Sequence, residues 1–191
     1  KVARCVEDQF EFEEDETVLL DFACGTGLVS RALAPVCKSV VGADVNPSAI
    51  ARYNARVVQQ GLAPEEMRAV HVDQLGAEKF DVVVCSMAYH HFSSIASSTT
   101  QLAAYLKPGG ALFVADLLRP AASKGSSKLL HVGGPIHLHG GKVEHPDGFT
   151  TDEMQNVFRE AGLEDVQVKV VHVVEGGKGD WEVFLASGWA P

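Results

Sequence analysis

Apolar residues along the chain fall into short runs separated by stretches with helical spacing. Five of these short runs predict buried strands at Val18–Phe22, Ser39–Ala43, Ala69–Val72, Phe80–Ser86 and Ala111–Ala115. Between the strands, apolar residues line one face of helices predicted over 28–36, 47–60 and 92–106. Asn46 and Pro47 favour the second of these helix starts, because Asn is a good N-cap and Pro suits the first helical position.

The periodic pattern is lost between Leu117 and Gly148, where Gly, Ser, Pro and His dominate. A long stretch of this kind inside a domain is usually functional, so we expect a flap over the substrate side. The pattern returns at Thr150, which forms a capping-box signature with Glu153. Two further strands are then predicted, antiparallel to each other, at Val166–Val174 and Trp181–Ala186.

Strands that alternate with helices predict an α/β fold in one domain spanning 1–191. We expect a Rossmann-like open sheet of seven strands, mostly parallel, with an antiparallel C-terminal strand and helices on both faces. Sheets of this kind bind ligands beyond the carboxyl ends of their strands, where the strand order reverses. Candidate functional residues are therefore those that follow the first four strands.

Composition and charge exclude some classes of function. The 191 residues carry a net charge of -9 with no basic cluster, which argues against a nucleic-acid partner. No apolar run approaches the length needed to span a membrane. The four cysteines are scattered without a CxxC pair, which favours a reducing, cytoplasmic location over a disulfide framework.

Acidic residues end three successive predicted strands: Asp21, Asp44 and Asp73. Gly25 and Gly27 follow the first of these, and alone they would be equally consistent with an ordinary tight turn. An acid beside a glycine loop would repel a pyrophosphate but attract an ammonium or sulfonium group. A carboxylate at the end of the second strand can accept ribose hydroxyls. The three acids together predict a nucleoside ligand with a positively charged tail, the alternative being solvated strand-end acids.

Five segments carry a resemblance to a known family: VLLDFACGTGLVS (18–30), VGADVNPSAI (41–50), FDVVVCSMAYHHF (80–92), LKPGGALFVAD (106–116) and GFTTDEMQNVFREAG (148–162). Together they resemble class I S-adenosylmethionine-dependent methyltransferases, in the small-molecule branch that includes ubiquinone and menaquinone biosynthesis enzymes. The resemblance implies S-adenosylmethionine as cofactor. It further implies that the methionine part is held by Asp21, Ala23, Gly25 and Gly27, the ribose by Asp44, and the adenine by Asp73. Ala23 departs from the family, which more often has glycine there. The remaining candidates for cofactor binding are Thr26, Val45, Gln74 and Ser86.

Three histidines are candidate catalytic residues. His90 and His91 follow the fourth strand, where a structural hydrogen bond is the competing interpretation. His145 lies where the resemblance resumes after the flap. A metal site is not expected, because the spacing of the histidines in the flap region is loose (His131, His137, His139 and His145).

The predicted function is transfer of a methyl group from S-adenosylmethionine to a small organic acceptor. One alternative is a catalytically inactive cofactor-binding fold that serves as a partner or regulatory subunit. A second alternative is a protein methyltransferase. Because few residues precede the first strand, we expect the acceptor pocket to be open, completed by a second subunit in a homodimer, or completed by residues upstream of Lys1.

Overall fold

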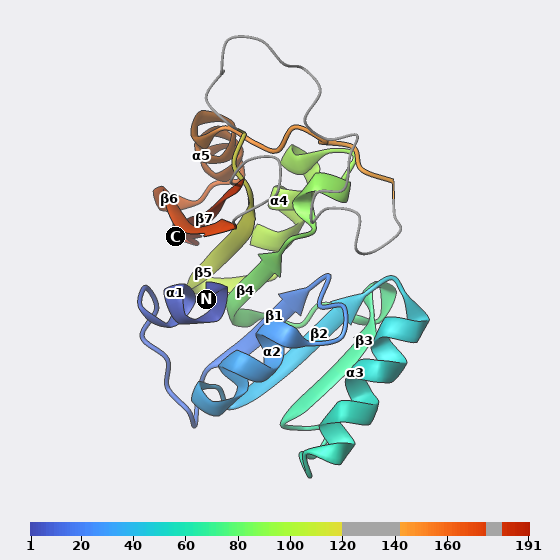
Figure 1. Ribbon diagram of the computed structural model, residues 1–191. Coiled ribbons are helices and arrows are strands. Elements are labelled where there is room, and N and C mark those ends of the chain that lie inside the picture. Colours follow the sequence, from blue (N-terminus) through green and yellow to red (C-terminus); the bar gives the residue numbers. More distant parts are fainter. Residues whose placement is uncertain (120–141, 175–180) are drawn as a thin grey trace.

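Seven strands form one sheet in the order β3-β2-β1-β4-β5-β7-β6 (Figure 1). The structure is a computed structural model that describes residues 1–119, 142–174 and 181–191. The strands are β1 (Val18–Phe22), β2 (Ser39–Asp44), β3 (Met67–His71), β4 (Phe80–Ser86), β5 (Leu106–Leu117), β6 (Glu164–Val174) and β7 (Trp181–Trp189). Pairing is parallel from β3 to β5, and β7 is antiparallel to both β5 and β6. The predicted fold class is therefore confirmed.

Helices cover both faces of the sheet (Figure 1). Residues of α1, α2 and α3 pack into one hydrophobic cluster, and residues of α4 and α5 pack into another on the opposite face. The α-helices are α1 (Val2–Glu7), α2 (Leu28–Leu33), α3 (Pro47–Gln59), α4 (Ile95–Ala103) and α5 (Thr151–Glu160). Three short 3-10 helices accompany them: η1 (Ala34–Val36), η2 (Val72–Gln74) and η3 (Tyr89–His91).

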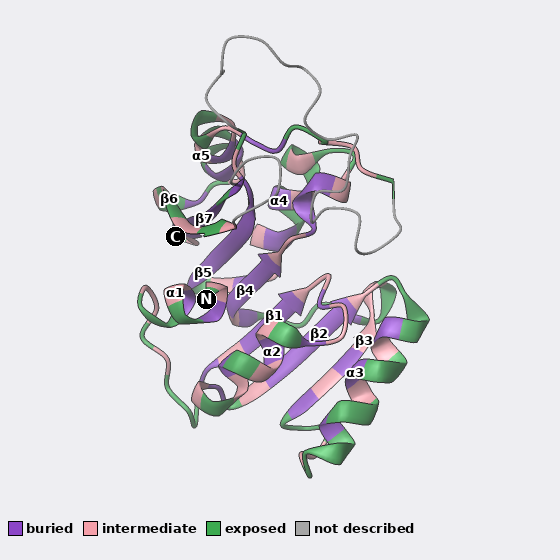
Figure 2. Cartoon of the chain, viewed as in Figure 1, coloured by how far each residue is buried: buried purple, intermediate pink, exposed green. Residues whose placement is uncertain are grey.

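The central strands are buried on both faces, which explains their nearly continuous apolar sequences (Figure 2). Alternate residues of a strand point to opposite faces, so consecutive apolar residues are shared between the two clusters. Leu19 and Val82 belong to the cluster under α1 to α3, whereas Leu20 and Val83 belong to the cluster under α4 and α5. Burial on both sides holds the ends of β1 and β4 in fixed positions.

The strand order reverses at β1, which has β2 on one side and β4 on the other. In this register Phe22, the last residue of β1, lies opposite both Ala43 of β2 and Cys85 of β4. The loops that leave β1, β2 and β4 therefore emerge at one edge of the sheet. This edge is the crevice where open sheets bind their ligands.

Two helix starts are confirmed with the predicted chemistry. The Asn46 side chain accepts hydrogen bonds from the N–H groups of Ser48 and Ala49, and Pro47 occupies the first turn of α3. Thr150 and Glu153 form the capping box that begins α5.

Several element bounds differ from those predicted. The third strand ends at His71, because its side chain caps η2 and draws Val72 out of the strand. The predicted helix over 92–106 is shorter, since the Ser94 side chain caps α4 and Leu106 begins β5. Helix α1 was not predicted, because its six residues are too few to show a helical period. Residues 120–141, most of the predicted flap, lie outside the described residues.

Candidate functional site

The glycine loop joins β1 to α2 and is tied to the neighbouring strand. The N–H of Cys24 donates to the carbonyl of Ala43 (3.1 Å), and the N–H of Gly27 closes the turn on the carbonyl of Cys24 (2.9 Å). Gly25 has a φ of +54°, and a Cβ added there would meet nothing within 4 Å. The loop therefore exposes backbone to open space at the sheet edge, where a ligand can approach closely.

The Asp44 carboxylate accepts hydrogen bonds from two backbone N–H groups, and both of its oxygens can accept further hydrogen bonds. Its Oδ2 accepts the N–H of Gly25, and its Oδ1 accepts the N–H of Asn46, both at 2.8 Å. An ionised carboxylate offers about four lone-pair sites, so each oxygen can accept one further hydrogen bond. The carboxylate is half-buried, and its remaining acceptor capacity suits a ligand with two hydroxyl groups. Its hydrogen bond to the N–H of Gly25 also ties the glycine loop to the end of β2.

Asp21 lies beneath the loop and is only 2% exposed. Its Oδ2 accepts hydrogen bonds from both the N–H and the hydroxyl of Ser30 in α2. The pKa of Asp21 is raised to about 6, mainly because burial disfavours the charged form. The nearby charge of Asp44 also raises this pKa, whereas the hydrogen bonds from Ser30 lower it. Within the described ranges no Lys, Arg or His forms an ion pair with Asp21. The chain thus places a buried acid without a countercharge under the ligand edge.

Ala23 has a φ of +58°, in the left-handed region that favours glycine. This is the position where the resembled family more often has glycine. We expect Ala23→Gly to change the free energy of unfolding by less than about 1 kcal/mol, because relief of backbone strain offsets the greater entropy of glycine in the unfolded chain. Urea denaturation of both proteins measures this difference, and a loss of more than about 2 kcal/mol would show that the Ala23 methyl group makes an important contact.

The other predicted cofactor residues lie around the same edge. The Thr26 carbonyl turns toward two guanidinium groups, accepting from Nη1 of Arg31 (2.6 Å) and Nη1 of Arg56 (3.1 Å). Val45 follows Asp44 and is 67% exposed, which leaves an apolar surface beside the Asp44 carboxylate. Ser86 ends β4 and is half-buried.

Asp73 and Gln74 lie one strand farther away, after β3. The Asp73 side chain is 84% exposed and contacts Nδ1 of His71 at 3.3 Å. The Gln74 side chain accepts the N–H of His71 (3.2 Å) and so belongs to the cap of η2. In the sheet register His71 lies opposite Asp44, so Asp73 and Gln74, which follow it, remain near the Asp44 end of β2. Neither side chain is brought into direct contact with the glycine loop.

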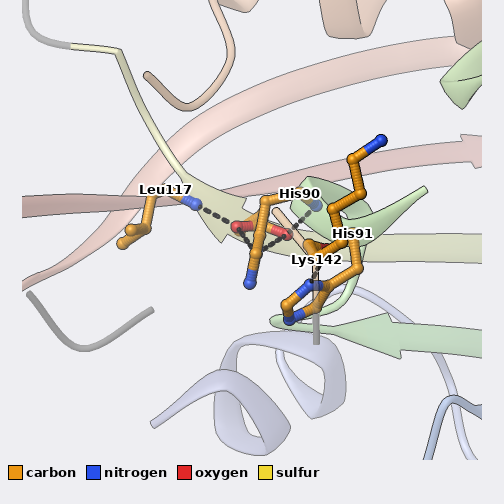
Figure 3. Close-up of polar contacts among 5 residues, drawn as sticks. His90, His91, Leu117 and Lys142 are labelled. Carbon is orange, nitrogen blue, oxygen red and sulfur yellow. Dashed lines mark hydrogen bonds and ion pairs between the residues drawn. The ribbon is translucent and has the colours of Figure 1, made fainter. Parts of the chain in front are cut away.

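His90 is buried against an acid that the sequence reasoning had not singled out (Figure 3). Its Nδ1 lies 2.9 Å and 3.0 Å from the two carboxylate oxygens of Asp116, at the end of β5. Asp116 is fully buried and also accepts the backbone N–H groups of His90 (3.2 Å) and Leu117 (2.7 Å). A carboxylate on this many donors is fixed in place and holds the imidazole ring with it.

The pairing decides which nitrogen of His90 can act as a base. An ionised carboxylate only accepts hydrogen bonds, so Nδ1 must carry the proton and the neutral ring has its free lone pair on Nε2. Within the described residues the hydrogen bonds of the ring go through Nδ1. His90 therefore has the arrangement of a general base oriented by a third group.

The structure also brings His91 and His145 to the end of β4. The rings of His90 and His91 lie 4.2 Å apart, and Nδ1 of His91 bonds the carbonyl of Lys142 (2.8 Å) (Figure 3). The backbone N–H of His145 donates to the carbonyl of His90 (3.0 Å), and its ring Nε2 lies in hydrogen-bond contact with the carbonyl of Phe92 (3.0 Å). These bonds to backbone carbonyls fix the segment that follows the undescribed stretch against η3. They give His91 and His145 evident structural partners.

Among the described residues, no group of three or more His, Cys, Asp or Glu side chains is positioned to hold a metal ion. His131, His137 and His139 lie outside those residues. No helix in the described ranges has the length and apolar character needed to cross a membrane.

Sequence reasoning missed two residues of the site. Asp116 had the same signature as Asp21 and Asp44, an acid at the end of a buried strand on the ligand edge. Its pairing with His90 depends on contact between β4 and β5, which the sequence alone does not show. Ser30 stands where a dinucleotide-binding loop would have its third glycine, and the sequence indicates no other role for it. The structure shows that its hydroxyl and N–H hold Asp21.

Known proteins with similar sequences are methyltransferases. An uncharacterized methyltransferase of Schizosaccharomyces pombe is 38% identical over 160 residues, covering 78% of this chain and 54% of that protein. A ubiquinone biosynthesis O-methyltransferase of Cereibacter sphaeroides is 31% identical over 153 residues, covering 79% of this chain and 62% of that protein. The chain thus spans less than two thirds of the length of these relatives.

A solved structure shows the same fold. Phosphoethanolamine N-methyltransferase 2 of Haemonchus contortus, in complex with phosphomonomethylethanolamine and S-adenosylhomocysteine, superposes with a TM-score of 0.74. The match covers 97% of this chain and 51% of that one, at 12% identity. At this identity the likeness concerns the fold.

The family model described as a methyltransferase domain matches residues 1–168 of this chain. The match includes the glycine loop, Asp44 and the His90–Asp116 pair. Together with the seven-stranded fold and the relatives above, it shows that the chain belongs to the class I S-adenosylmethionine-dependent methyltransferases.

Proposed function

We propose that this protein transfers a methyl group from S-adenosylmethionine to a hydroxyl group of a small organic acceptor. The buried His90–Asp116 pair at the end of β4 is the observation that carries this proposal. A general base is needed only where the nucleophile holds a proton that it does not lose unaided, and a hydroxyl is such a nucleophile. The likeness to a ubiquinone biosynthesis O-methyltransferase supports an oxygen acceptor.

The residues of the site divide between holding the cofactor and handling a proton. Asp44 and the backbone at Gly25 would hold the ribose and the methionine part, and Val45 would contact the adenine. When bound, S-adenosylmethionine supplies a methyl group on an already activated sulfonium. His90 accepts the acceptor's hydroxyl proton at Nε2 while Nδ1–H stays bonded to Asp116. The Asp116 carboxylate then stabilises the imidazolium charge.

A panel of acceptors tests the proposal. The protein is incubated with S-adenosylmethionine and, separately, with phenols, catechols, small amines and unfolded protein, and formation of S-adenosylhomocysteine is followed by mass spectrometry. We expect turnover with phenols or catechols. Turnover confined to the protein substrate would favour a protein methyltransferase. Cofactor binding without turnover on any acceptor would favour a regulatory subunit.

The titration of Asp21 predicts that cofactor affinity depends on pH. Its pKa is raised to about 6 by burial, and only the ionised form attracts the cationic methionine part of the cofactor. We expect affinity for S-adenosylmethionine to be constant above pH 7 and to fall by up to about tenfold per pH unit below 6. Calorimetry between pH 5 and 8 measures this. An Asp21→Asn variant should bind more weakly at pH 7 and lose the dependence.

The titration of Asp21 also affects the stability of the free protein, but with the opposite dependence on pH: the folded state gains stability as the pH falls. The folded-state pKa is about 6 and the ordinary value is 3.8, so the folded state holds the proton more tightly. The stabilisation that results is present below pH 3.8 and is lost as the pH rises through 6. We expect Asp21→Asn to remove this component from the unfolding free energy measured against pH. The same profile in parent and variant would show that Asp21 does not titrate in this range.

A further inference from the structure

The ring of Tyr53, on α3, fills the space below the glycine loop and is 1% exposed. A Cβ added to Gly27 would lie 2.6 Å from both Cδ2 and Cε2 of this ring. A Cβ added to Gly42 would lie 2.8 Å from Cε2 and 3.0 Å from Cζ of the ring, and 2.8 Å from Sγ of Cys24 in the loop. The ring therefore occupies the volume that two side chains would need, one in the loop and one in β2.

These two glycines lie on either side of the cofactor-binding groups. Gly27 closes the turn of the loop and stands at the N-cap of α2. Gly42 lies opposite Asp21 in the sheet and precedes Asp44 by two positions in the same strand. A rigid ring in contact with both glycines fixes the distance between the loop and β2. That distance allows the 2.8 Å hydrogen bond between the N–H of Gly25 and Asp44.

The hydroxyl of Tyr53, unlike the ring, is not among the atoms nearest to a Cβ added at Gly27 or Gly42. It is buried and makes no hydrogen bond of good geometry in the described part of the chain, although the Ser30 side chain lies close enough to act on its pKa. Burial raises the pKa of Tyr53 well above its ordinary value, so the group stays neutral. A buried hydroxyl without a partner costs free energy, and its removal is tolerated. The contacts with the loop are thus made by the ring.

We propose that Tyr53 is a positioning residue for the glycine loop. Its aromatic ring keeps the loop at the distance from β2 that cofactor binding requires. The proposal rests on the cofactor that the family uses and not on the acceptor proposed above. Tyr53 acts through Gly27, Gly42 and Asp44.

Calorimetric titration of the full chain with S-adenosylhomocysteine tests the proposal without an acceptor. Tyr53→Phe keeps the ring, and we expect a Kd within about twofold of the parent value. Tyr53→Leu removes the flat ring, and we expect affinity to fall at least about tenfold, because small displacements of binding groups have large effects. Gly42→Ala crowds both the ring and the Sγ of Cys24, which would lie 2.8 Å from the added Cβ, so it tests the spacing of the loop and β2 and should also weaken binding.

Val57→Ala is the matched control. Val57 is buried in the same helix, but none of its atoms is among those nearest to a Cβ added at Gly27 or Gly42. This substitution should lower the melting temperature and leave the Kd unchanged. If Tyr53→Leu fails to fold, Tyr53→Met, which keeps much of the side-chain volume without a ring, takes its place. A parent-like Kd in whichever of these variants folds, or an equal loss of affinity in Val57→Ala, would overturn the proposal. A parent protein that binds no S-adenosylhomocysteine would instead overturn the cofactor assignment on which the proposal rests.

Discussion

Replacing His90 with asparagine should lower kcat by about 10²- to 10⁴-fold, the range expected for loss of a general base. The amide nitrogen of asparagine can take the place of Nδ1 and keep a donor on Asp116, so the buried carboxylate is not left without its partner. What the variant lacks is Nε2. Initial rates with an accepted phenol or catechol measure the effect.

His91→Asn is the matched control, since His91 neighbours His90 but bonds a backbone carbonyl instead of an acid. We expect it to retain activity within about tenfold of the parent, since it is not assigned the base. Cofactor affinity should be unchanged in both variants, because neither side chain is among the groups assigned to the cofactor. Equal activity losses in the two variants would contradict the assignment of His90 as the base.

Asp116→Asn tests the orienting role separately. An asparagine amide at this position can donate to Nδ1, which would move the ring proton to Nε2 and remove the base without removing the histidine. We expect a loss in kcat comparable to that of His90→Asn and no further loss in the double variant, because the two residues act as a unit. Additive losses in the double variant would indicate two independent roles.

Replacing Asp44 with alanine should weaken binding of S-adenosylmethionine by about 1–3 kcal/mol, which is roughly tenfold to hundredfold in Kd. The variant loses the acceptor for the ribose hydroxyls and leaves the N–H groups of Gly25 and Asn46 without their partner. The second loss adds to the first, because the loop is no longer tied to the end of β2. Calorimetry with the folded variant measures the change.

Asp73→Ala provides the comparison for Asp44. The Asp73 side chain is largely exposed and pairs with His71, so an interaction with adenine through it would be partly screened by water. We expect its removal to weaken binding by less than about 1 kcal/mol. A parent-like affinity in Asp44→Ala, or a larger loss in Asp73→Ala, would show that the ribose is not held at the end of β2.

The sequence by itself determined the order of strands and helices from Val18 onward, the chemistry of two helix caps, and the edge of the sheet at which the strand-end acids lie. These features depend on local physics. Apolar runs such as 82–85 are strands because both of their faces are buried, and Asn46-Pro47 starts a helix through its own side chain and fixed φ angle. Acids at strand ends could be assigned to one edge because parallel strands carry their carboxyl ends together.

Only the tertiary structure decided which of those residues face one another. His90 lies in η3, just after β4, and Asp116 lies in the neighbouring strand β5 on the far side of α4 in the sequence, so their pairing follows from the register of β4 and β5. Tyr53 appeared in the sequence as one apolar position of a helix, and its contacts with Gly27 and Gly42 exist because α3 packs over β2. Residues that are distant in the sequence become partners through packing, and packing depends on the whole set of buried side chains.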